Sequence, residues 1–165
     1  MNAKIVWVVL TLVLLVACGG NAQRQTSGER ERCNAVFLAD ARAYYHKAES
    51  HWACRDFDEA LPYADTAIAL AKETGDREME CRALVIKAAA FEGKWDYAMA
   101  KKTLHRLMDI GLQPYADEAR ERFAWCCLEL GEYEEALAAL PDSLSEEGVA
   151  LKALLDARLD LREGD

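Results

Sequence analysis

The stretch Arg55–Asp76, RDFDEALPYADTAIALAKETGD, opens with a turn around Phe57 and closes with a Thr-Gly-Asp stop. Between these ends, Ala60, Ala64 and Ala67 recur at the three- and four-residue spacing of one helix face. Small side chains on such a face let a second helix approach closely, because the distance between packed helices depends on the side chains at the contact. The stretch therefore predicts a helix packed tightly against a neighbouring helix.

The residues before this stretch supply the neighbour, because positions 41–54 carry Tyr44, Ala48 and His51 at i, i+4 and i+7. The two segments together resemble one tetratricopeptide (TPR) repeat, with large and small residues on the first helix and Ala-x3-small-x2-Ala on the second. The resemblance implies an all-α fold, a right-handed α-solenoid of antiparallel helix pairs. We interpret His51 as a core residue and Phe57 as a plug between the two helices.

Two further units follow in the same register, because Ala100 and Ala136 take the place of Ala60 at spacings of 40 and 36 residues. The family's unit has about 34 residues, so the excess falls in the connections. Gly131–Ala136 matches the family's turn between helices, whereas Trp95 stands where most repeats have Gly, which leaves the tightness of that turn open. The predicted repeats cover residues 41–74, 81–114 and 117–144.

A terminal helix is expected over residues 149–161, after Pro141 cuts the third repeat short. Leu151, Leu155 and Leu159 can pack back on the third repeat, while Leu154 and Leu161 are surplus. Two interpretations stay open: a natural cap helix, or a chain truncated from a longer repeat array.

The N-terminus combines Lys4 with an apolar run over residues 5–16, the length of a signal-peptide core rather than of a membrane span. It ends in Leu15-Val16-Ala17-Cys18, which resembles the bacterial lipobox. The resemblance implies cleavage before Cys18, diacylglycerol on its sulfur and a fatty acid on its new amine, and Gly19 indicates the outer membrane. We expect a signal peptide over 1–17, a tether over 18–28 and a helical domain over 29–165. The alternatives are an ordinary secretory signal with an incidental Cys, or an uncleaved anchor.

The net charge of −9 argues against nucleic acid and against electrostatic binding to anionic lipid, so the lipid is the only expected membrane contact. The acidic residues can also be read as solvating the outer helix faces. The same composition, 52% hydrophobic with 3 prolines, favours a folded helical protein over a disordered one.

The sequence predicts no enzyme, no cofactor and no metal site. Besides Cys18, an odd number of cysteines remains, which argues against a complete disulfide framework, and none forms a Cys-x-x-Cys pair. We interpret them as small apolar fillers. The histidines lack metal-ligand spacing, and no nucleophile has a base and an acid beside it. The five cysteines are Cys33, Cys54, Cys81, Cys126 and Cys127.

The expected functional surface is the inner face of the solenoid, which in this family is lined by positions 2, 5, 9 and 12 of each first helix. Aromatic and Arg side chains there suit a protein or extended peptide partner, which makes the chain a lipid-anchored adaptor or scaffold. A sensor input domain from a longer array is the alternative, and Trp52 and Trp125 could instead pack between repeats. By register the predicted groove residues are Arg42, Tyr45, Glu49, Trp52, Arg82, Val85, Ala89, Glu92, Glu118, Glu121, Trp125 and Leu128.

Overall fold

The computed structural model describes Arg32 and residues 34–163, and all regular structure in that part of the chain is helical. The chain divides into two units, residues 1–37 and 38–165, and the second is the helical domain considered below. The predicted signal peptide, Cys18 and the tether lie outside the described residues. None of the helices in the described part is long and apolar enough to cross a membrane.

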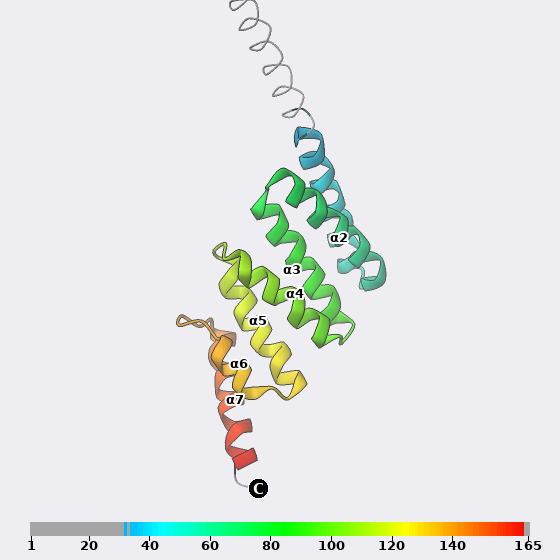
Figure 1. Cartoon of the computed structure of the whole chain (residues 1–165). Coiled ribbons are helices and arrows are strands. Elements are labelled where there is room, and N and C mark those ends of the chain that lie inside the picture. Colours follow the sequence, from blue (N-terminus) through cyan, green and yellow to red (C-terminus); the bar gives the residue numbers. More distant parts are fainter. Residues whose placement is uncertain (1–31, 33, 164–165) are drawn as a thin grey trace, which may run out of the picture. The chain divides into compact units, whose positions relative to one another are not determined.

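The domain consists of consecutive helices that pack each against the next, which confirms the predicted architecture of helix pairs (Figure 1). Residues 38–53 form the first helix of the first pair. The helices that follow are α2 (Phe57–Thr74), α3 (Arg77–Gly93), α4 (Tyr97–Ile110), α5 (Tyr115–Leu130), α6 (Tyr133–Ala139) and α7 (Glu146–Glu163).

The alanines at the predicted helix contacts are fully buried. Ala60, Ala64 and Ala67 of α2 have no exposed surface, and neither do Ala100 of α4 and Ala136 of α6. Larger side chains fill the space between these close contacts, and the main cluster includes residues from every helix from α2 to α7. The small residues therefore set the helix distance, and the large ones supply most of the buried apolar area.

The three turns inside the pairs share one backbone conformation. Arg55, Trp95 and Gly131 all have positive φ, at 61°, 61° and 78°. In each turn the next backbone N–H donates to a carbonyl five residues earlier, at 2.8–3.0 Å. Trp95 thus forms the same turn as Gly131, with the residue 75% exposed and its ring edge-on to that of Tyr97. Residues with a Cβ in this region carry backbone strain of about 1–3 kcal/mol.

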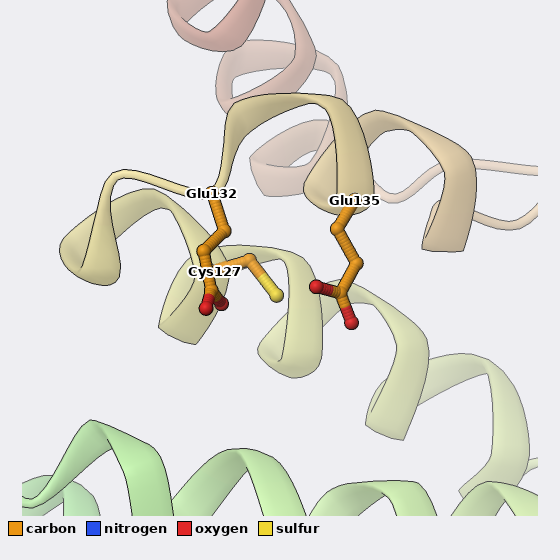
Figure 2. A group of neighbouring side chains, drawn as sticks. All are labelled: Cys127, Glu132 and Glu135. Carbon is orange, nitrogen blue, oxygen red and sulfur yellow. The ribbon is translucent and has the colours of Figure 1, made fainter.

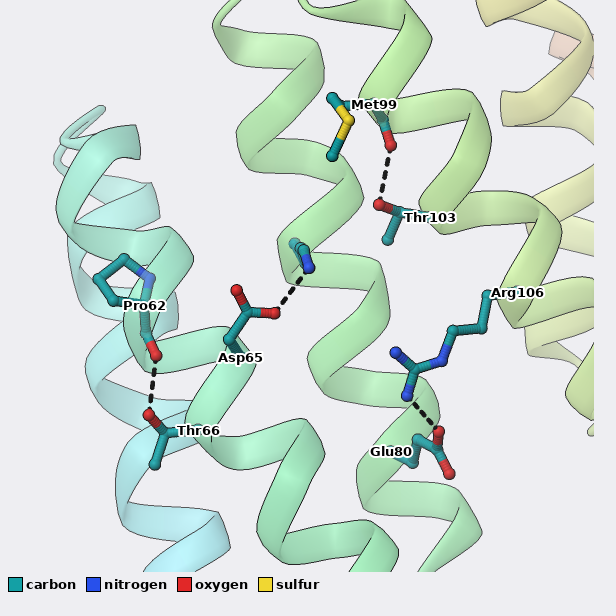
Figure 3. A network of polar contacts seen from close by, with 8 residues as sticks. Pro62, Asp65, Thr66, Glu80, Met99, Thr103 and Arg106 are labelled. Carbon is teal, nitrogen blue, oxygen red and sulfur yellow. Dashed lines mark hydrogen bonds and ion pairs between the residues drawn. The ribbon is translucent and has the colours of Figure 1, made fainter.

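Ion pairs join successive helices away from the turns (Figure 3). Lys87 of α3 donates to Asp65 of α2 at 2.6 Å, and Arg106 of α4 donates to Glu80 of α3 at 2.7 Å. Such partly exposed pairs contribute little to stability individually, but they fix which residues face each other between helices.

The C-terminal part has a short helix followed by a long one. Helix α6 ends at Ala139, just before Pro141, after only 7 residues. Helix α7 begins at Glu146, three residues before the predicted start, because Ser145 caps it: its Oγ accepts the Gly148 N–H at 3.0 Å. Leu151 and Leu155 are buried against the preceding helices.

Candidate functional site

Ten of the twelve predicted groove positions line three cavities on the first helices of the pairs. The central cavity, about 750 Å³, collects residues from the helix over 38–53, from α3 and from α5. Predicted residues in its wall are Trp52, Val85, Ala89, Glu92 and Glu118. The structure adds Ala53, Arg55, Phe57, Ile86, Gly93 and Arg122.

The wall of the central cavity is mainly apolar. Val85 and Ala89 lie one helical turn apart on α3, and the ring of Trp52 stands at the edge with 39% of its surface exposed. Phe57, expected between its own two helices, shares the cavity wall with Trp52 of the first helix, and its ring also lies against Gly93 of α3. A cavity of this kind suits an apolar side chain from a partner, with an indole available for further contact.

One ion pair in the wall of the central cavity joins α5 to α3. Arg122 of α5 donates from Nε and Nη2 to the two carboxylate oxygens of Glu92 on α3, at 3.1 and 2.8 Å. Its Nη1 also lies 3.6 Å from Glu118 Oε1. Both side chains of the bidentate pair are about a quarter exposed. Glu92, a predicted partner contact, is thus held by Arg122 within the fold.

A second cavity, about 350 Å³, contains the predicted residues Arg42, Tyr45 and Arg82. Arg82 donates to Tyr115 OH at 3.2 Å and to Glu78 at 2.6 Å. These hydrogen bonds, that to Tyr115 first, raise the pKa of Arg82, and its guanidinium stays charged.

Glu49 is one of the two predicted groove residues that line none of the three cavities, and it supports a neighbour instead. Its carboxylate accepts from Tyr45 OH at 3.1 Å and lies 3.2 Å from Nδ1 of His46. Burial, and then the hydrogen bond to Glu49, raise the pKa of Tyr45. Glu49 therefore fixes the direction in which the Tyr45 ring points.

A third cavity, about 400 Å³, lies between α5 and the start of α7 and contains Glu118, Glu121 and Trp125. Trp125 is 45% exposed. The carboxylate of Glu121 accepts from the Ser145 N–H at 2.7 Å and from its hydroxyl, just before α7 begins. Glu121 therefore anchors the turn that starts the terminal helix. Leu128, the last predicted position, is half-buried and packs against the main core.

The histidine prediction needs correction. His51 was expected in the core, but its side chain is 35% exposed. Its ring stacks on Tyr63 at 5.2 Å between centroids, and its Nδ1 lies 3.2 Å from Asp56. The imidazole sits at the helix end, where Asp56 gives it a polar partner that a core position would not offer.

Three side chains near the third turn have the donor types of a metal site: Cys127, Glu132 and Glu135 (Figure 2). The ammonium of Lys101 already lies between the two carboxylates, donating at 2.6 and 2.7 Å. Burial by itself would lower the pKa of Lys101, but these two hydrogen bonds outweigh burial and raise it. Burial also raises the pKa of Cys127 to about 11, which disfavours the thiolate that a metal needs. Glu132 and Glu135 therefore form an ion-pair cluster around the ammonium of Lys101.

The remaining thiols divide by exposure. Cys81, Cys126 and Cys127 are fully buried, and burial raises the pKa of Cys126 to about 12. Cys54 is exposed at the end of the first helix, so the interpretation as an apolar filler is wrong for this residue. Cys33 lies outside the described residues.

Comparison with known proteins identifies the type of fold. The family model described as tetratricopeptide repeat matches residues 41–74. The chain also resembles the crystal structure of the TPR domain of Arabidopsis FLU, with a TM-score of 0.56 and 18% sequence identity, over 76% of this chain and 98% of that one. Residues 41–74 thus carry a TPR repeat, and the described domain has the TPR type of α-solenoid. TPR domains generally bind other proteins and are typically not enzymes.

Proposed function

We propose that this chain is a lipid-anchored adaptor that binds an extended segment of a partner protein across the first helices of its pairs. The observation that carries the proposal is the central cavity, an open and mainly apolar space of about 750 Å³ lined by side chains from three successive first helices. The lining comes from three successive first helices, and such a surface suits an extended peptide segment that runs across them.

The exposed aromatic rings beside the cavities support recognition of particular side chains of the partner. Trp52 and Trp125 stand about half exposed at the edges of the first and third cavities. Exposed aromatic rings beside an apolar cavity are typical anchors in protein interfaces, because they bury a large area with few rotatable bonds. The partner segment would place an apolar side chain in the central cavity.

The test is capture of the partner by crosslinking in membranes, followed by mass spectrometry, and then titration of the identified segment. Trp52→Ala should weaken binding by about thirtyfold, since truncating a buried aromatic anchor typically costs about 2 kcal/mol or more. Trp95→Ala is the matched control, because Trp95 is 75% exposed and lies outside the three cavities.

Arg82→Ala provides a second probe that leaves the helix core intact, since Arg82 is about half exposed. Loss of binding in both variants, with unchanged helical circular dichroism and melting, supports the proposal. Full affinity in Trp52→Ala and Arg82→Ala, together with loss in Trp95→Ala, places the binding surface elsewhere.

The anchor is a separate part of the proposal and rests on Leu15-Val16-Ala17-Cys18 behind a short apolar run. Several acyl chains at one cysteine anchor a protein stably, whereas one chain binds only marginally. Cys18→Ser should release the protein from membranes and abolish processing that globomycin blocks. Unchanged membrane fractionation and mass in this variant would refute the anchor while leaving the cavity proposal untouched.

A further inference from the structure

Helix α7 has an apolar stripe on each of two nearly opposite faces. The first stripe, with Leu151 and Leu155, is buried against the preceding helices. The second recurs at i, i+4, i+7 and i+11 and is exposed, with Leu154 40% and Leu161 70% accessible. In a solenoid such a face is normally covered by the next element of the stack. The exposed stripe consists of Ala150, Ala153, Leu154, Ala157 and Leu161.

Charged residues border this stripe on both edges, and each edge carries both acidic and basic side chains. One edge carries Glu147 and Arg158, and the other carries Lys152, Asp156 and Asp160. None of the five makes an ion pair with another residue in the described part of the chain. Arg162, which lies toward the buried side of α7, does pair, with Glu134 of α6. The edges of the exposed stripe therefore present solvent-exposed charges of both signs that are available to a partner.

We propose that two copies of this chain associate through α7, with the two helices antiparallel. In an antiparallel pair related by a two-fold axis, each edge of one helix faces the same edge of the other. Glu147 then faces Arg158 of the second copy, and Lys152 faces Asp156 of the second copy. The midpoint lies between Lys152 and Ala153 for the first pairing and at Leu154 for the second, so one register centred near Ala153 brings both pairs close.

In the same register, the part of the apolar stripe from Ala150 to Ala157 meets its own copy, whereas Leu161 lies opposite Glu146 at the start of the second helix. The axis passes near Ala153 and Leu154, which brings Leu154 beside its own copy, and the alanines let the two helices approach closely. One helix pair buries less than the roughly 800 Å² per partner of a standard stable interface. The dimer should therefore be reversible, and the high local concentration of membrane-anchored chains would favour it.

The decisive experiment is disulfide trapping of the full chain in membranes. Ala153→Cys places a thiol near the proposed axis, and Ala138→Cys, on an exposed position of α6, is the matched control. Mild oxidation should give a homodimer for Ala153→Cys, with at most the wild-type background for Ala138→Cys. Adding Leu154→Glu should reduce the trapped dimer about tenfold or more, because it places a carboxylate in the apolar centre.

Charge exchange tests the antiparallel order independently. In the Ala153→Cys background, Glu147→Arg should reduce trapping, and the further change Arg158→Glu should restore it. Equal trapping of Ala153→Cys and Ala138→Cys, or trapping of Ala153→Cys to a different protein, overturns the proposal. Failure of the double exchange to restore the dimer, with helical circular dichroism intact, overturns the antiparallel pairing.

Discussion

The ring of Phe57, at the start of α2, occupies the space that a side chain at Gly93, at the end of α3, would need. A Cβ atom at position 93 would stand 2.6 Å from Phe57 Cε2. The contact joins the turn of the first pair to the next first helix, and it forms part of the wall of the central cavity.

Gly93→Ala should therefore lower the free energy of unfolding by about 1–3 kcal/mol through overpacking. The same change in a Phe57→Ala background should cost much less, since the ring that it meets is gone. Urea unfolding of the four proteins gives the coupling as a double-mutant cycle. Additive effects of the two substitutions would show that the Phe57 ring does not oppose a side chain at position 93.

The buried alanines give a second test, of the helix contacts. Ala64→Leu and Ala136→Leu each add a large side chain at a position with no exposed surface, and each should cost about 1–3 kcal/mol. Ala138→Leu, at an exposed position of the short α6, should change stability by less than about 0.5 kcal/mol. Denaturation midpoints measure all three, and an unchanged midpoint in both buried variants would contradict the close packing.

Alkaline pH should destabilise the domain through its buried thiols. Burial raises the pKa of Cys126 to about 12, from an ordinary 9.0, so the folded state holds this proton more tightly than the unfolded chain does. The stabilisation is fully present below pH 9.0 and is lost as the pH rises toward 12. Urea titrations across this range should show a shallower decline in Cys126→Ala, while Cys54→Ser, which alters an exposed thiol, should follow the wild type.

Lys101 supplies the fourth test, because its ammonium lies between Glu132 and Glu135. Lys101→Met keeps the length of the stem but leaves the two carboxylates facing each other, so the melting temperature should fall. Chelators should leave the wild-type melting temperature unchanged. A drop on chelation, reversed by added Zn²⁺, would mean that the cluster holds a metal instead.

The helix pairing could be predicted from the sequence because it depends on local spacing. Ala60, Ala100 and Ala136 recur in one register, and a fully buried alanine leaves a periodic signal that needs no knowledge of distant contacts. Trp95 was the ambiguous position, and the structure shows that a non-glycine residue completes the same turn when the residue is largely exposed.

The details of the cavities could not be predicted in the same way, because they depend on contacts between repeats. Arg122 stands four residues after Glu118, a helical spacing that signals an ion pair, yet its bidentate partner is Glu92, 30 residues away. Likewise Glu121 reaches Ser145, and Phe57 reaches Gly93. A single-repeat pattern gives the face on which a residue lies, but not the side chain that meets it from the next unit.

The brevity of α6 has a consequence for how the array comes apart. In the described domain contacts run mainly between neighbouring helices, and α7 is held only by α5 and by the seven-residue α6. The array is a chain of linked units whose weakest link lies before the last helix. Amide protons of α7 should accordingly exchange through a local opening that leaves α3 and α4 protected, so the C-terminal helix behaves as a separate cooperative unit.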